Sequence, residues 1–196
     1  MTDQAAPSAQ VPDFEDETDV VTRLMRRKFA FAREVAEYDE LVENEGQARH
    51  MHTHHTRPST GHPTHCPPHA RAARRAQEPV NAVYYKDDGD QYRPHCDGEC
   101  HGGGYRRGRR IATSLTYCLV GDKGGYTSFD RAGLKVVPKR RMMLFFGYKI
   151  NGDPPAMDNG QTEHSGCPLR EGRKWIATMW YREGMTPERG WQQHQH

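Results

Sequence analysis

The 196-residue sequence is poor in hydrophobic residues, poor in cysteine and nearly balanced in charge. Only 34% of its residues are hydrophobic and its mean hydropathy is −1.01, values too low for a chain that is packed throughout. We therefore expect the core to be concentrated in one part of the chain. A net charge of +2 gives no overall attraction to nucleic acid. Five cysteines, an odd number, do not form a disulfide-rich framework, and at least one must be unpaired.

Signals for membranes and for secretion are also missing. No apolar run is long enough to span a membrane. The first ten residues lack the basic and apolar regions of a signal peptide, and the last six carry no retention signal of the Lys-Asp-Glu-Leu type. As written, the sequence predicts a soluble, cytoplasmic protein with no membrane segment.

The N-terminal part divides by composition. Residues 1–19 hold six acidic residues and no basic ones, which predicts a disordered acidic arm. Residues 20–43 carry apolar side chains at roughly helical spacing, with charges between them. This pattern predicts one amphipathic helix with Thr18 or Asp19 as its N-cap and Gly46 as a stop signal.

Residues 44–78 form a His- and Pro-rich segment. Seven of the chain's twelve histidines lie between His50 and His69. Such tracts can capture Zn, Ni or Cu loosely. The favoured interpretation is a disordered low-complexity linker without a dedicated metal, because Cys66 alone does not complete a zinc-finger pattern.

The remaining residues, 79–196, have the pattern of β structure. The predicted strands are short, and turn signals rich in Gly and Asn separate them. They cover residues 80–85, 111–120, 134–137, 142–148 and 175–181. Because no helical pattern lies between them, the strands favour a sandwich or a barrel over a parallel α/β sheet, and about 117 residues suffice for an eight-stranded double sheet. Our prediction is a mainly β fold with a double-stranded β-helix (jelly-roll) core, preceded by the N-terminal helix.

A candidate metal site begins with His95 and Asp97. On an extended segment, residues two apart point to the same side. With the distant His164, they have the ligand content of a 2-His-1-carboxylate facial triad, which holds non-haem Fe(II) and leaves positions open. The alternative is a chance His-x-Asp spacing, with His95 on the surface near a turn. Cys96 should alternate away from the ligands, and we interpret Cys96 and Cys100 as incidental or as a redox pair.

Lys174 strengthens the case for the metal site. It opens an aromatic-flanked strand ten residues after His164. A Lys that enters an apolar barrel needs an anionic partner, because an unpaired buried charge is unfavourable. An acidic co-substrate would supply that partner. The alternative is a solvated Lys at a strand end.

Five sequence blocks extend this pattern over residues 85–183. They are Tyr85-x6-Tyr92-x2-His95-x-Asp97, Arg110-Ile111-Ala112-Thr113, Gly124-Gly125-x-Thr127-x-Phe129, Val137-Pro138-Lys139, and His164-Ser165-Gly166-Cys167-Pro168-Leu169-x2-Gly172-x-Lys174-Trp175-x4-Trp180. In order and spacing they resemble the catalytic domain of prolyl 4-hydroxylases of the procollagen and plant or algal type. That family belongs to the 2-oxoglutarate- and Fe(II)-dependent dioxygenases.

The resemblance implies metal ligands, co-substrate-binding residues and substrate-groove residues. The implied metal ligands are His95, Asp97 and His164. The implied co-substrate-binding residues are Lys174, Tyr85 and Thr113, and the implied substrate-groove residues are Tyr92, Arg110 and Trp180. The implied reaction couples oxidative decarboxylation of 2-oxoglutarate to C–H hydroxylation of peptidyl proline through a ferryl intermediate. It uses Fe(II), O2 and L-ascorbic acid. The implied partner is a proline-containing peptide or protein, not nucleic acid.

The sequence also departs from the family pattern. The turn after Tyr85 is longer than usual, so Tyr84 is an alternative to it. Arg182 replaces a substrate-side His, which predicts a different substrate preference. Two alternative functions stay open: the same chemistry on another protein side chain or small molecule, and a non-catalytic metal-binding jelly-roll scaffold. The resemblance also implies the endoplasmic reticulum or secretory pathway, in conflict with the missing signal peptide.

Overall fold

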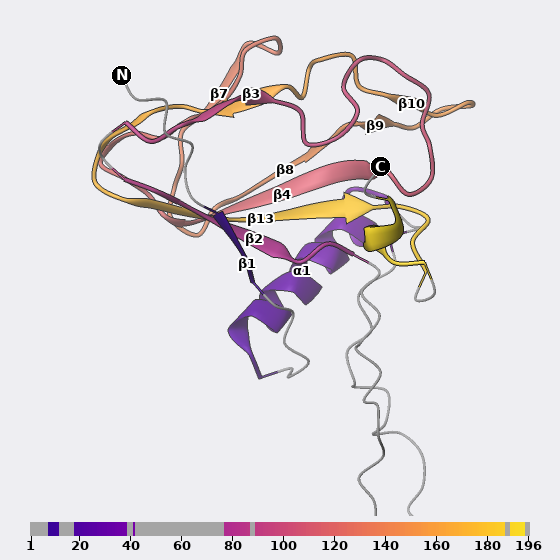
Figure 1. The fold of residues 1–196 in the computed structure, drawn as a ribbon, viewed down its shortest axis with the longest axis horizontal. Helices are drawn as coiled ribbons and strands as arrows, with labels where there is room; N and C mark the ends of the chain where they lie inside the picture. Colours follow the sequence, from indigo (N-terminus) through magenta and orange to yellow (C-terminus); the bar gives the residue numbers. More distant parts are fainter. Residues whose placement is uncertain are drawn as a thin grey trace, which may run out of the picture.

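The computed structural model describes residues 8–11 (backbone only), 18–38, 41, 77–86, 89–186 and 189–194. Two antiparallel β-sheets face each other, and helix α1 (Val20–Glu34) packs on the outer side of the larger sheet (Figure 1). The predicted mainly β, jelly-roll fold is therefore confirmed. Within the described part of the chain, no helix combines the length and the apolar character that a membrane crossing requires.

The strands of the described residues form four sheets. The larger facing sheet has the strand order β1 (Ser8–Val11), β2 (Val80–Tyr85), β13 (Lys174–Arg182), β4 (Arg110–Leu119), β8 (Met143–Gly147). The smaller has the order β3 (Tyr92–His95), β11 (His164–Gly166), β6 (Thr127–Phe129), β7 (Leu134–Val136). Two short pairs join β10 (Ala156–Met157) to β9 (Lys149–Ile150) and β12 (Leu169–Glu171) to β5 (Lys123–Gly124). A 3-10 helix, η2, covers Trp191–His194.

Alternation along the central strand β13 gives the larger sheet two different faces. Lys174, Ile176, Thr178 and Trp180 line a pocket between the two sheets. The residues between them point to the other side, where Met179 and other apolar side chains pack against α1. A period of two thus separates the residues of the pocket from the core under the helix.

Helix α1 begins as predicted and ends earlier than predicted. The Asp19 side chain accepts a hydrogen bond of 2.9 Å from the Thr22 backbone N–H, which makes Asp19 the N-cap. The helix ends at Glu34 and not at residue 43, because the chain turns at Glu37 into left-handed backbone with φ 55°. Tyr38 beyond it is still buried in the core under the sheet. The apolar spacing therefore reflected burial, not a continuing helix.

Two other boundaries differ from the sequence prediction. Ser8–Val11, expected to be disordered, forms strand β1 and pairs with β2. Gln77 and Glu78, placed in the linker, are 0% and 5% exposed and belong to the folded domain. The rest of the acidic arm up to residue 17, the stop signal Gly46 and the His-rich tract up to residue 76 lie outside the described residues.

Candidate active site

The two predicted histidine ligands face each other across neighbouring strands. His95 ends β3 and His164 begins β11, and the antiparallel register makes them direct partners with ring centroids 4.4 Å apart. Asp97 follows β3 by two residues. Its Oδ1 lies 3.5 Å from His95 Nε2 and its Oδ2 lies 3.7 Å from His164 Nε2. One ligand atom from each residue lies within 4.8 Å of the others, so the sequence-predicted trio converges.

A hydrogen bond at Nδ1 fixes each imidazole ring so that its Nε2 faces Asp97. His95 Nδ1 lies 2.7 Å from the carbonyl oxygen of Arg93, and His164 Nδ1 lies 3.0 Å from that of Thr162. A carbonyl oxygen only accepts, so each Nδ1 carries the proton and donates it. In its neutral form, each ring then offers an Nε2 lone pair on the Asp97 side, which a metal ion can bind; in its protonated form, Nε2 carries a proton and attracts the Asp97 carboxylate instead. Two imidazole nitrogens and one carboxylate held in this way fit a divalent iron ion.

Asp97 is held in its ionised form. Burial alone would raise its pKa, but the hydrogen bond with His95, the positive charge of His164 and a 2.7 Å hydrogen bond from Thr113 Oγ1 together lower that pKa to about 2. Thr113 was predicted to donate to 2-oxoglutarate. The structure instead directs its hydroxyl at Asp97, because Thr113 lies on the strand immediately behind the ligand.

The two histidines differ in their acidity. Burial lowers the pKa of His164. Burial acts in the same direction on His95, but the Asp97 hydrogen bond and the Arg93 carbonyl outweigh it and raise the pKa of His95. His164 is the more deeply enclosed ring, with 6% of its side chain exposed against 31% for His95. The trio is therefore open to solvent mainly on the His95 side.

Lys174 lies inside the barrel and not at its surface. Its side chain is 1% exposed, and Nζ donates a 2.8 Å hydrogen bond to the carbonyl oxygen of Gly125. Nζ also lies 4.4 Å from the centre of the Tyr85 ring and 5.8 Å from that of Tyr117. Burial lowers its pKa to about 8. A buried cation whose described contacts are one carbonyl and two aromatic rings fits a carboxylate ligand.

The metal trio and Lys174 share one pocket of about 480 Å³, a volume that includes its open mouth. The predicted residues Tyr85, Tyr92 and Trp180 also line it. Tyr84 points to the opposite face of the sheet, where it stacks on Trp175 at 4.7 Å, so it does not replace Tyr85. The pocket wall therefore contains seven of the nine site residues that the sequence predicts.

Sequence reasoning missed three polar residues of the pocket: Thr127, Asn81 and Thr178. Thr127 stood in a family block without a role, and its Oγ1 is 2.7 Å from the Tyr117 hydroxyl. Asn81 and Thr178 could have been found from alternation, since each lies an even number of positions from a predicted pocket residue on the same strand.

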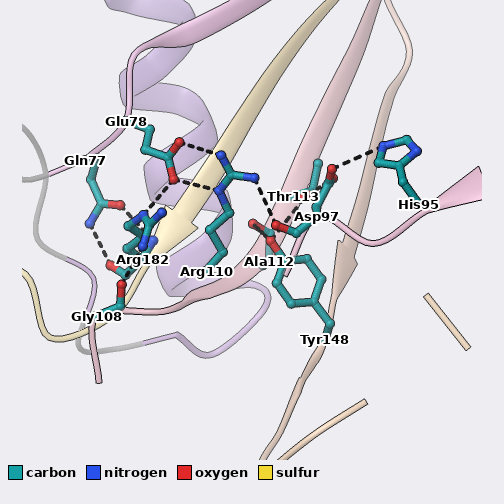
Figure 2. A network of polar contacts seen from close by, with 10 residues as sticks. All are labelled: Gln77, Glu78, His95, Asp97, Gly108, Arg110, Ala112, Thr113, Tyr148 and Arg182. Carbon is teal, nitrogen blue, oxygen red and sulfur yellow. Dashed lines mark hydrogen bonds and ion pairs between the residues drawn. The ribbon is translucent and has the colours of Figure 1, made fainter. Parts of the chain in front are cut away.

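Arg110 and Arg182 differ from their predicted surroundings. Arg110 does not line the pocket wall; its guanidinium bonds to Glu78 and to the Asp97 backbone (Figure 2). The same guanidinium lies over the Trp180 ring. Arg182, expected on the substrate side, is 7% exposed and bonds to Glu78. Glu78 itself was missed, because it carried no local signal at the end of the predicted linker.

A jelly roll that brings two histidines and one aspartate together in an open pocket defines the class of non-haem metal-dependent oxygenases. The family model described as the 2OG-Fe(II) oxygenase superfamily matches residues 80–182, just over half of the chain. The chain belongs to this superfamily.

Individual curated relatives match about half of the chain. Probable prolyl 4-hydroxylase 8 of Arabidopsis thaliana is 33% identical over 120 residues, which cover 50% of this chain and 40% of that protein. The prolyl 4-hydroxylase subunit alpha-1 of Gallus gallus is 33% identical over 100 residues, 48% of this chain and 19% of that protein. The chain thus spans less than half the length of these curated relatives.

A solved structure shares the fold. The viral collagen prolyl hydroxylase vCPH of Paramecium Bursaria Chlorella virus-1, in its 2OG complex, superposes with a TM-score of 0.63. The sequences are 20% identical, and the match covers 91% of this chain and 80% of the viral one. At this identity the likeness supports the fold alone, which is the jelly-roll architecture.

Proposed function

We propose that this chain is a 2-oxoglutarate- and Fe(II)-dependent dioxygenase domain that hydroxylates peptidyl proline. The observation that carries the proposal is the pairing of His95 with His164 across β3 and β11, with Asp97 and the buried Lys174 in the same pocket. The names of the relatives, prolyl 4-hydroxylases from plants and animals, support the choice of proline.

The pocket residues divide between the metal and the co-substrate. The two Nε2 atoms and the Asp97 carboxylate would hold Fe(II), and Lys174 would neutralise the distal carboxylate of 2-oxoglutarate. Fe(II) with 2-oxoglutarate and O2 supplies the power to hydroxylate an unactivated C–H bond, giving succinate and CO2, and ascorbate is the proposed reductant. The protein contributes a fixed ligand geometry and an apolar wall.

Aromatic side chains on the pocket suit a proline-rich substrate. Tyr92 is 40% exposed, and its ring centroid lies 4.4 Å from that of His95. Trp180 lines the pocket, and its indole Nε1–H is buried without a hydrogen-bond partner among the described residues. A polyproline II segment packs well on such surfaces, because its conformation is already fixed before it binds.

The test is turnover of labelled 2-oxoglutarate. The protein is incubated with Fe(II), ascorbate and O2, with and without proline-rich peptides, and CO2 release and peptide mass are followed. We expect peptide-stimulated CO2 release with a gain of one oxygen on proline. Turnover that no proline peptide stimulates would favour another substrate for the same chemistry. No turnover and no stoichiometric iron would favour the metal-binding scaffold instead.

Matched histidine variants locate the activity. His164→Ala removes one proposed ligand and should abolish turnover while leaving the fold largely intact. His101→Ala changes an exposed histidine outside the pocket and should leave turnover unchanged. Near-normal activity in His164→Ala would remove His164 from the site.

The compartment is proposed from a disulfide. Cys96 and Cys100 form one in the loop that carries Asp97, which corrects their interpretation as incidental. Disulfides persist in oxidising compartments, so we favour the secretory pathway over the cytoplasm. Thiol labelling of the protein isolated from its cells, with and without prior reduction, would show two additional reactive thiols only after reduction. Full labelling without reduction would favour the cytoplasm.

A further inference from the structure

Glu78 is a buried carboxylate that uses both of its oxygens. Arg110 Nε donates to Oε1 and Arg110 Nη2 donates to Oε2, each at 2.7 Å, which makes a bidentate pair (Figure 2). Arg182 Nε donates to the same Oε1 at 2.6 Å. Burial would raise the pKa of Glu78, but the two guanidiniums lower it, so the carboxylate stays charged.

Through this pair, Glu78 reaches the active site at two points. Arg110 Nη1 donates a 2.9 Å hydrogen bond to the backbone carbonyl oxygen of Asp97, a proposed metal ligand. The carbon of the same guanidinium lies 3.9 Å from the centre of the Trp180 ring, which lines the pocket. One planar group therefore touches the metal side of the pocket with its edge and the substrate side with its face.

The position of Glu78 is itself fixed from outside the pocket. The side chain of the preceding residue, Gln77, accepts a 2.8 Å bond from the Arg182 backbone N–H and donates a 2.7 Å bond to the Arg182 carbonyl oxygen. Arg182 Nη1 also donates at 2.7 Å to the carbonyl oxygen of Gly108. These bonds tie the residues before β2 to the end of β13, so the carboxylate is presented to Arg110 in one orientation.

Asp97 needs such support, because it lies beyond the end of β3. Its carbonyl accepts from a side chain, Arg110, and not from a neighbouring strand. We propose that Glu78 is a positioning residue of the active site, which acts by fixing Arg110 against the Asp97 backbone and the Trp180 indole. The substrate part of this role rests on the proposed function, whereas the metal part requires only that the trio binds a divalent ion.

Glu78→Gln tests the role, since it keeps the shape and removes the charge that holds Arg110. The dissociation constant for Mn(II), measured by equilibrium dialysis, should rise by about tenfold to 100-fold, the usual effect of losing support around a metal ligand. The KM for a proline-rich peptide should also rise. The Kd for 2-oxoglutarate at saturating metal should change by less than about twofold, because Lys174 lies outside this network.

Glu183→Gln is the matched control. Glu183 is 4% exposed, and its carboxylate pairs with Lys149 Nζ at 2.5 Å, but this ion pair does not reach the trio within the described part of the chain. Both variants should unfold at lower urea concentration, while only Glu78→Gln should weaken Mn(II) binding. If Glu78→Gln does not fold, Arg110→Lys decides, because a single ammonium keeps the charge but cannot reproduce the bidentate pair and the Asp97 contact together.

Two results would overturn the role: unchanged Mn(II) affinity in the folded variant, or an equal loss of affinity in Glu183→Gln. Failure of the proposed function gives a different result. If the wild-type protein turned over no proline peptide while Glu78→Gln still weakened Mn(II) binding selectively, the substrate would be wrong and the positioning role of Glu78 would stand.

Discussion

The buried ammonium of Lys174 makes the binding of 2-oxoglutarate sensitive to pH above neutrality. Burial lowers its pKa from 10.5 to about 8. The phenol rings of Tyr85 and Tyr117 face the ammonium, and burial raises the pKa of both, so they stay neutral in this range. Lys174 is therefore the group near the proposed carboxylate site whose charge changes around pH 8.

The size of the effect follows from the titration of Lys174. With a pKa of about 8, about nine-tenths of the side chain is charged at pH 7 and about one-tenth at pH 9. If the charged form alone holds the distal carboxylate, the Kd for 2-oxoglutarate should rise about tenfold between these values. Binding at pH 8 should take up about half a proton, because the bound carboxylate restores the charged form.

Calorimetric titration of Mn(II)-loaded protein with 2-oxoglutarate measures both quantities. Titrations at pH 7, 8 and 9 give the Kd, and buffers of different ionisation enthalpy give the proton uptake. Lys174→Arg is the control, since a guanidinium stays charged throughout and should give a flat profile whatever its absolute affinity. A flat wild-type profile, or the same slope in the Arg variant, would refute the assignment of Lys174 to the carboxylate.

Three further changes test the supports of the fold and of the site. Thr113→Val removes the donor to Asp97 at nearly constant volume and should weaken Mn(II) binding by about tenfold or more; unchanged affinity would show that this hydrogen bond does not position the ligand. Lys28, on the buried face of α1 and 1% exposed, has its pKa lowered by burial from 10.5 to about 8, so the unfolded state binds more protons between these values and stability should rise with pH across that window. In urea unfolding at pH 7, Lys28→Met should be more stable than the wild-type protein by up to about 3 kcal/mol. Its free energy of unfolding should also increase less than that of the wild type from pH 8 to pH 10. A variant less stable than the wild type would contradict the conclusion that the buried charge is destabilising. Replacing Cys96 and Cys100 together by Ser should lower the free energy of unfolding by about 2 kcal/mol, the chain-entropy value for so short a loop, and an unchanged urea midpoint would show that the disulfide contributes nothing.

The parts of the site that the sequence predicts are those that follow a strand period. Lys174 and Trp180 share a face because they are six apart on β13, whereas Asp97 lies in the loop after β3, so its approach to His95 is not fixed by strand alternation. His164 is different, since its pairing with His95 is a long-range register that spacing alone does not give. The order of the family's sequence blocks indicated that His164 belongs to the site, and the pairing of β3 with β11 places it beside His95.

The parts that sequence reasoning missed depend on contacts between distant segments. Glu78 follows a low-complexity tract and has no local pattern, yet it pairs with Arg110 and Arg182 across 32 and 104 positions of sequence. Thr113 was assigned to the co-substrate on the strength of the family resemblance alone. The direction of its hydroxyl depends on where the chain carries Asp97, and strand alternation does not determine that.

The placement of Asp97 explains why so many of these distant contacts meet at one residue. The two histidines lie within strands, where pairing between β3 and β11 fixes their backbone. Asp97 lies in a loop, and its carboxylate must nevertheless stay within reach of both imidazoles. A hydrogen bond from Thr113 holds the side chain, and Arg110 holds the carbonyl. The next residue is Gly98, because a Cβ there would overlap the Tyr148 ring. We therefore expect substitutions around Asp97 to weaken metal binding more than those around either histidine.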